Sequence, residues 1–139
     1  MDLDRFVSAQ DGGVYERALA EVRQGGKRSH WMWFVFPQLA GLGSSPTAAY
    51  YAIRDLAEAR AYLAHPRLGP RLIEISAAVA ASPVASATVL LGHPDDLKLR
   101  SSMTLFGRAA PDQEVFTRVL ARYFDGVPDA RTDELLTGR

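Results

Sequence analysis

The chain has 139 residues, of which 47% are hydrophobic and 23% charged, the composition of an ordinary globular domain. Its 16 basic and 16 acidic side chains cancel, so no overall positive field is present to attract DNA, RNA or an anionic membrane. The lack of cysteine excludes disulfides, thiolate metal sites and a cysteine nucleophile. Residues 1–5 are too acidic for a secretion signal, and no apolar run is long enough to span a membrane. We therefore expect one cytoplasmic domain over residues 1–139 that contacts no membrane and does not bind extended nucleic acid.

Helical spacing of apolar residues dominates the first quarter of the chain. We expect one helix over residues 2–10 and another over residues 14–22, each ended by a pair of glycines. Residues 30–36 are a run of His, Trp, Met, Trp, Phe, Val and Phe, and seven residues are too few to distinguish a helix from an extended segment. Residues 39–46 are rich in glycine and serine, which is typical of a loop.

From residue 47 the helical pattern returns, with Ile53, Leu56, Ala59 and Leu63 on one stripe of a helix. Alternation of period two, the pattern of a half-buried strand, is absent. The sequence therefore predicts an all-α, compact bundle of about six or seven helices with an aromatic-rich segment near residues 30–38. The remaining helical segments are expected at about 65–81, 86–91, 94–109, 111–124 and 131–136.

The aromatic run is the first candidate site. Its rings, between residues 31 and 36, can line a slot in which a base or nicotinamide ring stacks, with His30 and Gln38 as polar handles. Lys27 and Arg28 precede the run, and cations beside stacking rings suit a phosphorylated ligand. The alternative is that these aromatic side chains simply supply volume to the core.

The second candidate lies on the helix expected from residue 94. At 100° per residue, Leu99, Met103 and Phe106 fall on the inward face, and Lys98 and Ser102 fall between them. Because burying an unpaired ammonium is costly, Lys98 needs a carboxylate or an anionic ligand.

Two alternatives apply to Lys98. It can pair with Asp95, one turn earlier, with its stem packed along the surface. It can also form a nucleophilic dyad with Ser102, although a spacing of four residues is a weak signal without an oxyanion hole. Arg100, Thr104 and Arg108 fall on the opposite side of the helix and are expected to face solvent.

Several stretches spread over nearly the whole chain match a known family. On these stretches the chain resembles the small bacterial proteins grouped as domain-of-unknown-function family 1810. That family is predominantly helical and has no settled activity, so the resemblance implies a fold rather than a function. The matching stretches are residues 3–7, 9–11, 27–34, 36–38, 51–53, 59–63, 65–66, 68–69, 96–106 and 123–124, with Gly126 and Asp129.

A looser likeness concerns the order of elements. An aromatic block, a tyrosine-bearing segment at residues 50–52, a His-Pro helix start at 65–68 and a later lysine-bearing helix are similar to the NADAR family of small helical N-glycosidases. Those enzymes act on ADP-ribose-type or ribosyl-amine compounds. The likeness adds Tyr51 to the candidate ligand-binding residues, but it assigns the family's catalytic carboxylate to no residue here.

Together these observations predict a pocket between residues 27–38 and 95–106 that binds or hydrolyses a phosphorylated ribosyl or nucleotide-like small molecule. In an N-glycosidase-type hydrolase, a carboxylate of the second block would stabilise an oxocarbenium-like centre or activate water. The alternative is a non-catalytic protein-interaction module whose aromatic run is an exposed patch. No metal or other cofactor is expected. The candidate residues are Asp95, Asp96 and His30 for catalysis, and Lys27, Arg28, Trp31, Trp33, Gln38, Tyr51, Lys98, Ser101 and Ser102 for ligand binding.

Overall fold

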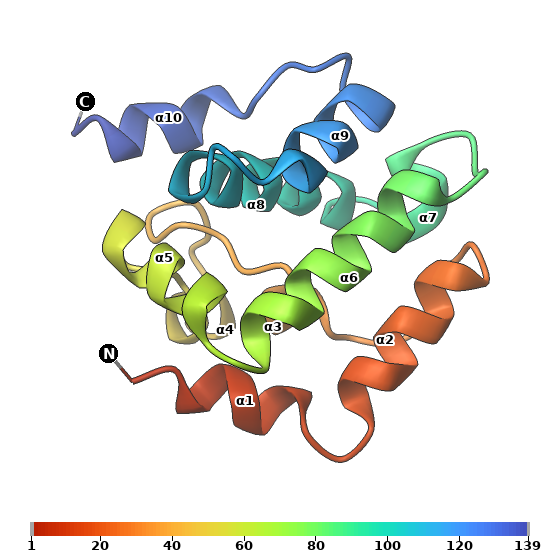
Figure 1. Ribbon diagram of the computed structural model, residues 1–139, viewed down its shortest axis with the longest axis horizontal. Coiled ribbons are helices and arrows are strands. Elements are labelled where there is room, and N and C mark those ends of the chain that lie inside the picture. Colours follow the sequence, from red (N-terminus) through yellow and green to blue (C-terminus); the bar gives the residue numbers. More distant parts are fainter. Residues whose placement is uncertain (1, 139) are drawn as a thin grey trace.

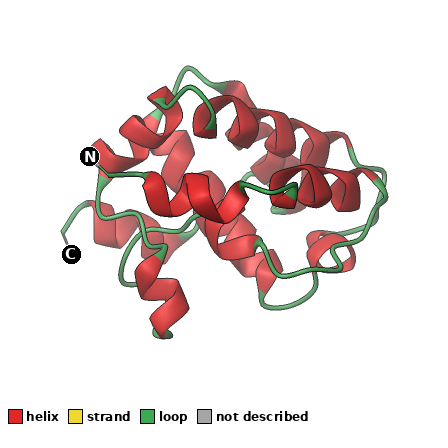
Figure 2. Ribbon diagram, turned by 90° about the horizontal axis from the view of Figure 1, so that it is seen from below, coloured by secondary structure: helices red, strands yellow, loops and turns green. Residues whose placement is uncertain are grey.

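The computed structural model describes residues 2–138, which form ten helices and no strand (Figure 1). Irregular loops make the connections between them (Figure 2). Seven of the helices have seven or more residues, so the predicted all-α class is confirmed. In chain order they are α1 (Asp4–Gln10), α2 (Val14–Arg23), α3 (Met32–Val35), α4 (Pro46–Tyr50), α5 (Leu56–Ala64), α6 (Leu68–Ala81), α7 (Ala87–Leu91), α8 (Asp95–Ala109), α9 (Glu114–Tyr123) and α10 (Ala130–Leu136).

Side-chain caps define the starts of four helices. Ser45, Asp55, Ser86 and Asp129 precede α4, α5, α7 and α10, and each side-chain oxygen accepts a hydrogen bond from the backbone N–H three residues later. Such caps satisfy donors that the first turn of a helix leaves free, and each typically contributes about 1 kcal/mol. Local sequence therefore accounts for where these helices begin.

Helix α8 lies at the centre of the bundle, packed against α5, α7, α9 and α10, while α6 packs against α2, α5 and α9 (Figure 1). Leu99, Met103 and Phe106 of α8 are fully buried, as predicted. Each such side chain contributes about 1.5–3 kcal/mol by leaving water. The first turns of α8 keep an uncovered surface, where Leu97 is exposed and Lys98 is partly exposed.

The predicted continuous helix from residue 47 is wrong. The chain leaves the helical conformation after α4, and Ile53 forms an isolated parallel bridge with Leu39. The Ile53 N–H donates to the Gln38 carbonyl at 2.8 Å, and the Ala40 N–H donates to the Ile53 carbonyl at 2.8 Å. This pairing links the loop after α3 to the segment before α5. Helical spacing within either segment could not predict that the two would be in contact.

The predicted solvent-facing side of α8 is wrong at Thr104, which is buried. Its hydroxyl donates to the Arg100 carbonyl and accepts the Asp129 N–H at 2.8 Å, because the segment leading into α10 crosses this side of α8. Arg100 is half-buried, with its guanidinium over the ring of Phe124, whereas Arg108 is exposed as predicted. A helix-wheel analysis assumes one covered face, and α8 is covered on several.

The aromatic run forms the short helix α3 and its flanks. Trp31 and Phe36 are buried in the core, so the alternative that aromatic side chains supply core volume is confirmed for these two. Trp33 and Phe34 are half-buried, so the run is not an exposed patch. Within residues 2–138, no helix is both long and apolar enough to cross a membrane.

Candidate functional site

A cavity of about 400 Å³, which we call the polar cavity, lies where the two predicted blocks meet. Trp33 and Gln38 line it from the first block, and Lys98 and Ser101 from the second. The loop over residues 42–45 forms another wall. The C-terminal segment adds Asp129 and Arg131. The structure therefore brings together four of the predicted ligand-binding residues.

Lys98 is the charged residue that α8 contributes to the lining of the polar cavity. Its Nζ lies 4.5 Å from the centre of the Trp33 ring, a cation–π arrangement, and its side chain is 21% exposed. The nearest carboxylate is Asp95, whose Oδ1 is 3.5 Å from Lys98 Nζ. The pairing with Asp95 that the sequence offered as an alternative is thus present.

Asp95 is not a partner for Lys98 alone. Its other oxygen, Oδ2, lies 2.9 Å from Nζ of Lys27, whose side chain is 9% exposed. Two lysines therefore share one carboxylate, and the closer contact belongs to the more buried lysine. The group of three carries one net positive charge, and Lys98 is its member that lines the polar cavity.

Gln38 and Ser101 link the two blocks by hydrogen bonds. The Gln38 amide donates from Nε2 to the Ser101 hydroxyl at 2.7 Å, and that hydroxyl donates to the Lys98 carbonyl at 3.0 Å. This chain of hydrogen bonds fixes the loop after α3 to the first turns of α8. It also orients polar groups toward the cavity that both residues line.

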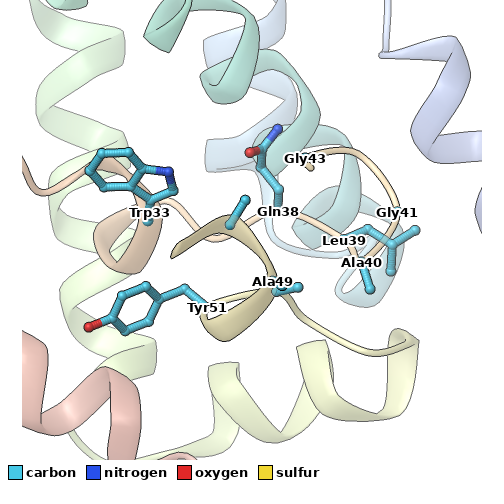
Figure 3. A pocket seen from close by; sticks show the side chains of 10 residues that line it. Trp33, Gln38, Leu39, Ala40, Gly41, Gly43, Ala49 and Tyr51 are labelled. Atoms are coloured by element: carbon cyan, nitrogen blue, oxygen red, sulfur yellow. The ribbon is translucent and has the colours of Figure 1, made fainter. Parts of the chain in front are cut away.

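A second, smaller cavity of about 170 Å³ adjoins the first and shares Trp33 and Gln38 with it. Figure 3 shows the rings of Trp33 and Tyr51 on one side of this cavity and the turn through Gly41 on the other. We call it the aromatic cavity. Tyr51 packs against Phe34, with ring centres 5.4 Å apart, and burial raises the pKa of its hydroxyl.

The predicted catalytic carboxylates do not line either cavity. Asp95 is engaged by the two lysines. Asp96 is buried and accepts hydrogen bonds from the Thr88 hydroxyl at 2.6 Å and the Leu97 N–H at 2.9 Å, and it lies 3.0 Å from Nδ1 of His93. Burial alone would raise the pKa of Asp96, but these hydrogen bonds outweigh burial and hold the pKa below its usual range. Its contacts fix α7 to the start of α8, which is a structural role.

Five further predicted residues lie outside both cavities: Lys27, Arg28, His30, Trp31 and Ser102. Trp31 is in the core, and the Arg28 side chain and His30 are exposed, so His30 does not share a cleft with Lys98. Ser102 is fully buried, and its hydroxyl has no hydrogen-bond partner within the described part of the chain. None of these side chains contributes to the walls of the polar cavity.

Glu21 is a buried residue with a structural role that the sequence analysis missed. Its buried carboxylate accepts hydrogen bonds from the Ser29 hydroxyl, the Trp31 indole at 2.9 Å, and the backbone N–H groups of Arg28 at 2.8 Å and Ser29 at 3.0 Å. Burial would raise the pKa of Glu21, but these four donors lower it to about 2. The carboxylate therefore anchors the segment that carries Lys27. A glutamate on the inward side of an amphipathic helix was the available signal.

Asp129 and Arg131 were also missed, because the C-terminal segment lies far from both blocks in sequence. Asp129 caps α10 by accepting the Thr132 N–H at 2.9 Å and the Thr132 hydroxyl at 2.5 Å. Arg131 is exposed and lies 3.3 Å from Glu134. In residues 2–138 there is no group of three or more His, Asp or Glu side chains placed to hold a metal ion.

Comparison with known proteins identifies the fold but not a ligand. The family model that matches residues 1–136 is described as a protein of unknown function (DUF1810). The chain is 54% identical to the conserved hypothetical protein Rv1873 from Mycobacterium tuberculosis, whose crystal structure it matches with a TM-score of 0.95 over 98% of this chain and 96% of that one. A comparison with curated proteins finds no match.

Proposed function

The chain belongs to the DUF1810 family of proteins of unknown function, and we propose that it binds a phosphorylated ribosyl or nucleotide-like small molecule in the polar cavity. The observation that carries the proposal is the sharing of Asp95 between Lys27 and Lys98. One carboxylate cannot neutralise two ammonium groups, so a positive charge remains at the wall of a cavity. An anionic group of a ligand would complete this arrangement.

The other lining residues favour an anionic ligand that also carries hydrogen-bonding groups. Ser101 and Gln38 present a hydroxyl and an amide, and Arg131, which pairs with Glu134, adds a second cation. The carboxylate of Asp129 also lines the cavity, but Thr132 occupies its Oδ2 with two hydrogen bonds. The charged side chains of the lining are thus two cations and one carboxylate.

The geometry supports binding rather than hydrolysis. A glycosidase needs a carboxylate that is free to protonate a leaving group, activate water or stabilise an oxocarbenium-like centre. Asp95 and Asp96 are engaged by other side chains and lie outside the cavity, and Asp129, which lines it, has its Oδ2 engaged as a helix cap. We therefore restrict the proposal to a ligand-binding protein.

The experiment is a thermal-shift titration with inorganic phosphate, ribose 5-phosphate, AMP and ADP-ribose. Ligand at a hundred times its Kd adds about 2.7 kcal/mol to the free energy of unfolding, so a true ligand raises Tm measurably. Lys98→Met keeps the packing of the lysine stem and removes its charge, and it should abolish the rise.

The matched control is Arg118→Met, which removes one positive charge from an exposed position on α9, away from both cavities. It should keep the full rise in Tm. If no phosphorylated compound raises Tm, or if Lys98→Met and Arg118→Met respond to ligand alike, the proposal is wrong.

A further inference from the structure

The two cavities differ in the chemistry of their walls although they share a boundary. Within residues 2–138, the side chains lining the aromatic cavity include no charged group: two aromatic rings, an amide and small apolar residues. The polar cavity has Lys98, Asp129 and Arg131 in its walls. Of these two cavities, only the polar cavity has charged side chains in its lining.

Two small residues, Gly43 and Ala48, lie at the boundary between the two cavities. Gly43 and Ala48 line both cavities, together with Trp33 and Gln38. A Cβ built on Gly43 would lie 2.5 Å from the Cβ of Ala48, closer than two carbon atoms approach, so the loop and α4 can meet here only because residue 43 has no side chain. Gly41 has a φ of +99°, a conformation that side-chain-bearing residues rarely adopt, and it forms the turn that closes the far wall.

The size of the aromatic cavity selects among possible occupants. At about 170 Å³ it is several times the ~30 Å³ share of one water molecule, and it is walled by Trp33 and Tyr51 (Figure 3). Flat aromatic side chains beside an uncharged space are the surroundings in which a planar heterocycle stacks. A sugar phosphate has no planar aromatic ring to stack on such walls.

We infer that the aromatic cavity is a subsite for the planar ring of a nucleoside phosphate whose phosphate group lies beside Lys98 in the polar cavity. This inference rests on the proposed function and narrows it, because it selects nucleotides over sugar phosphates. The ligand spans the boundary at Gly43 and Ala48, with Trp33 lining both compartments.

The test measures Kd for AMP and for ribose 5-phosphate, which carries a hydroxyl group in place of the adenine ring. Stacking on an aromatic side chain typically strengthens binding by about five- to a hundredfold, so wild-type protein should bind AMP about tenfold more tightly. Ala49→Leu fills the aromatic cavity from an exposed position on α4 that lies outside the polar cavity. It should bring the two Kd values together, because it should weaken the binding of AMP and leave the binding of ribose 5-phosphate unchanged.

Ala121→Leu adds the same side chain to an exposed position on α9 and should keep the tenfold preference. Tm without ligand, measured for both variants, shows that each is folded. Equal affinity of wild-type protein for AMP and ribose 5-phosphate, or a preference that survives in folded Ala49→Leu, would overturn the ring subsite while leaving the proposed function intact. Failure of both compounds to bind would overturn the proposed function, and this inference with it.

Discussion

Glu21 and Lys98 each bring one charge beside a tryptophan, Glu21 beside Trp31 and Lys98 beside Trp33. Glu21 is buried and accepts four hydrogen bonds, all from the loop that follows its own helix. Lys98 is partly exposed and shares its one carboxylate, Asp95, with another lysine. The first charge has a full set of hydrogen-bond donors within the protein, whereas the second shares its one counterion.

On our proposal, this difference separates a structural charge from a binding charge. A buried charge with a full set of partners stabilises the conformation around it, and removing it leaves several donors unpaired. A charge with a shared partner at the edge of a cavity can accept a further ligand at little cost to the fold. The predictions below test whether the two regions behave in these two ways.

The largest effect is expected from Glu21→Ala. The change leaves the buried Trp31 indole and two partly buried backbone N–H groups without an acceptor, so the free energy of unfolding should fall by about 2–4 kcal/mol. Urea unfolding measures the change. Glu16→Ala, an exposed glutamate on the same helix, is the control and should cost less than about 1 kcal/mol. Equal costs for the two variants would remove the distinction drawn for Glu21.

The same carboxylate should give stability a characteristic dependence on pH. The pKa of Glu21 falls from an ordinary 4.5 to about 2 on folding, so its contribution is complete above pH 4.5 and is lost as pH falls toward 2. Glu21→Gln resembles the protonated form. Wild type should be more stable than Glu21→Gln at pH 6, and the difference should shrink steadily between about pH 4.5 and pH 2. A difference that stays constant over that range would contradict the assignment.

A smaller effect is expected from Lys98→Met on the unliganded protein. Asp95 keeps its closer partner Lys27, so no carboxylate is left unpaired and the free energy of unfolding should change by less than about 1 kcal/mol. Urea unfolding without ligand measures it. A loss of several kcal/mol would show that Lys98 is half of a structural ion pair, as Glu21 is the centre of a structural cluster.

The fold class and most helix bounds could be predicted from sequence because apolar spacing and caps are local signals. Thr104 and the break at Ile53 could not, because both depend on segments that approach from elsewhere: the turn before α10 in one case and Leu39 in the other. The candidate site follows the same rule. Gln38, Lys98 and Ser101 could be predicted because they lie within the two blocks that the sequence singled out.

Other features of the site needed the structure. Asp129 and Arg131 reach the polar cavity from the end of the chain. The role of Asp95 depends on Lys27, 68 positions away in sequence, and not only on its neighbour Lys98. Helical spacing could show which side of α8 Lys98 lies on, but it could not show that a second lysine competes for the same carboxylate.

The most direct test of the account uses the two tryptophans that the chain contains, one in each region. Their indole N–H groups give two resonances in a ¹H–¹⁵N spectrum, assigned by Trp33→Phe. Trp31 is buried and donates to Glu21, whereas Trp33 lines both cavities beside Lys98. On titration with AMP, the Trp33 resonance should move and saturate while the Trp31 resonance stays in place, and Lys98→Met should remove the movement. Saturating movement of Trp31 alone, or no movement of either resonance, would contradict a ligand site at Lys98.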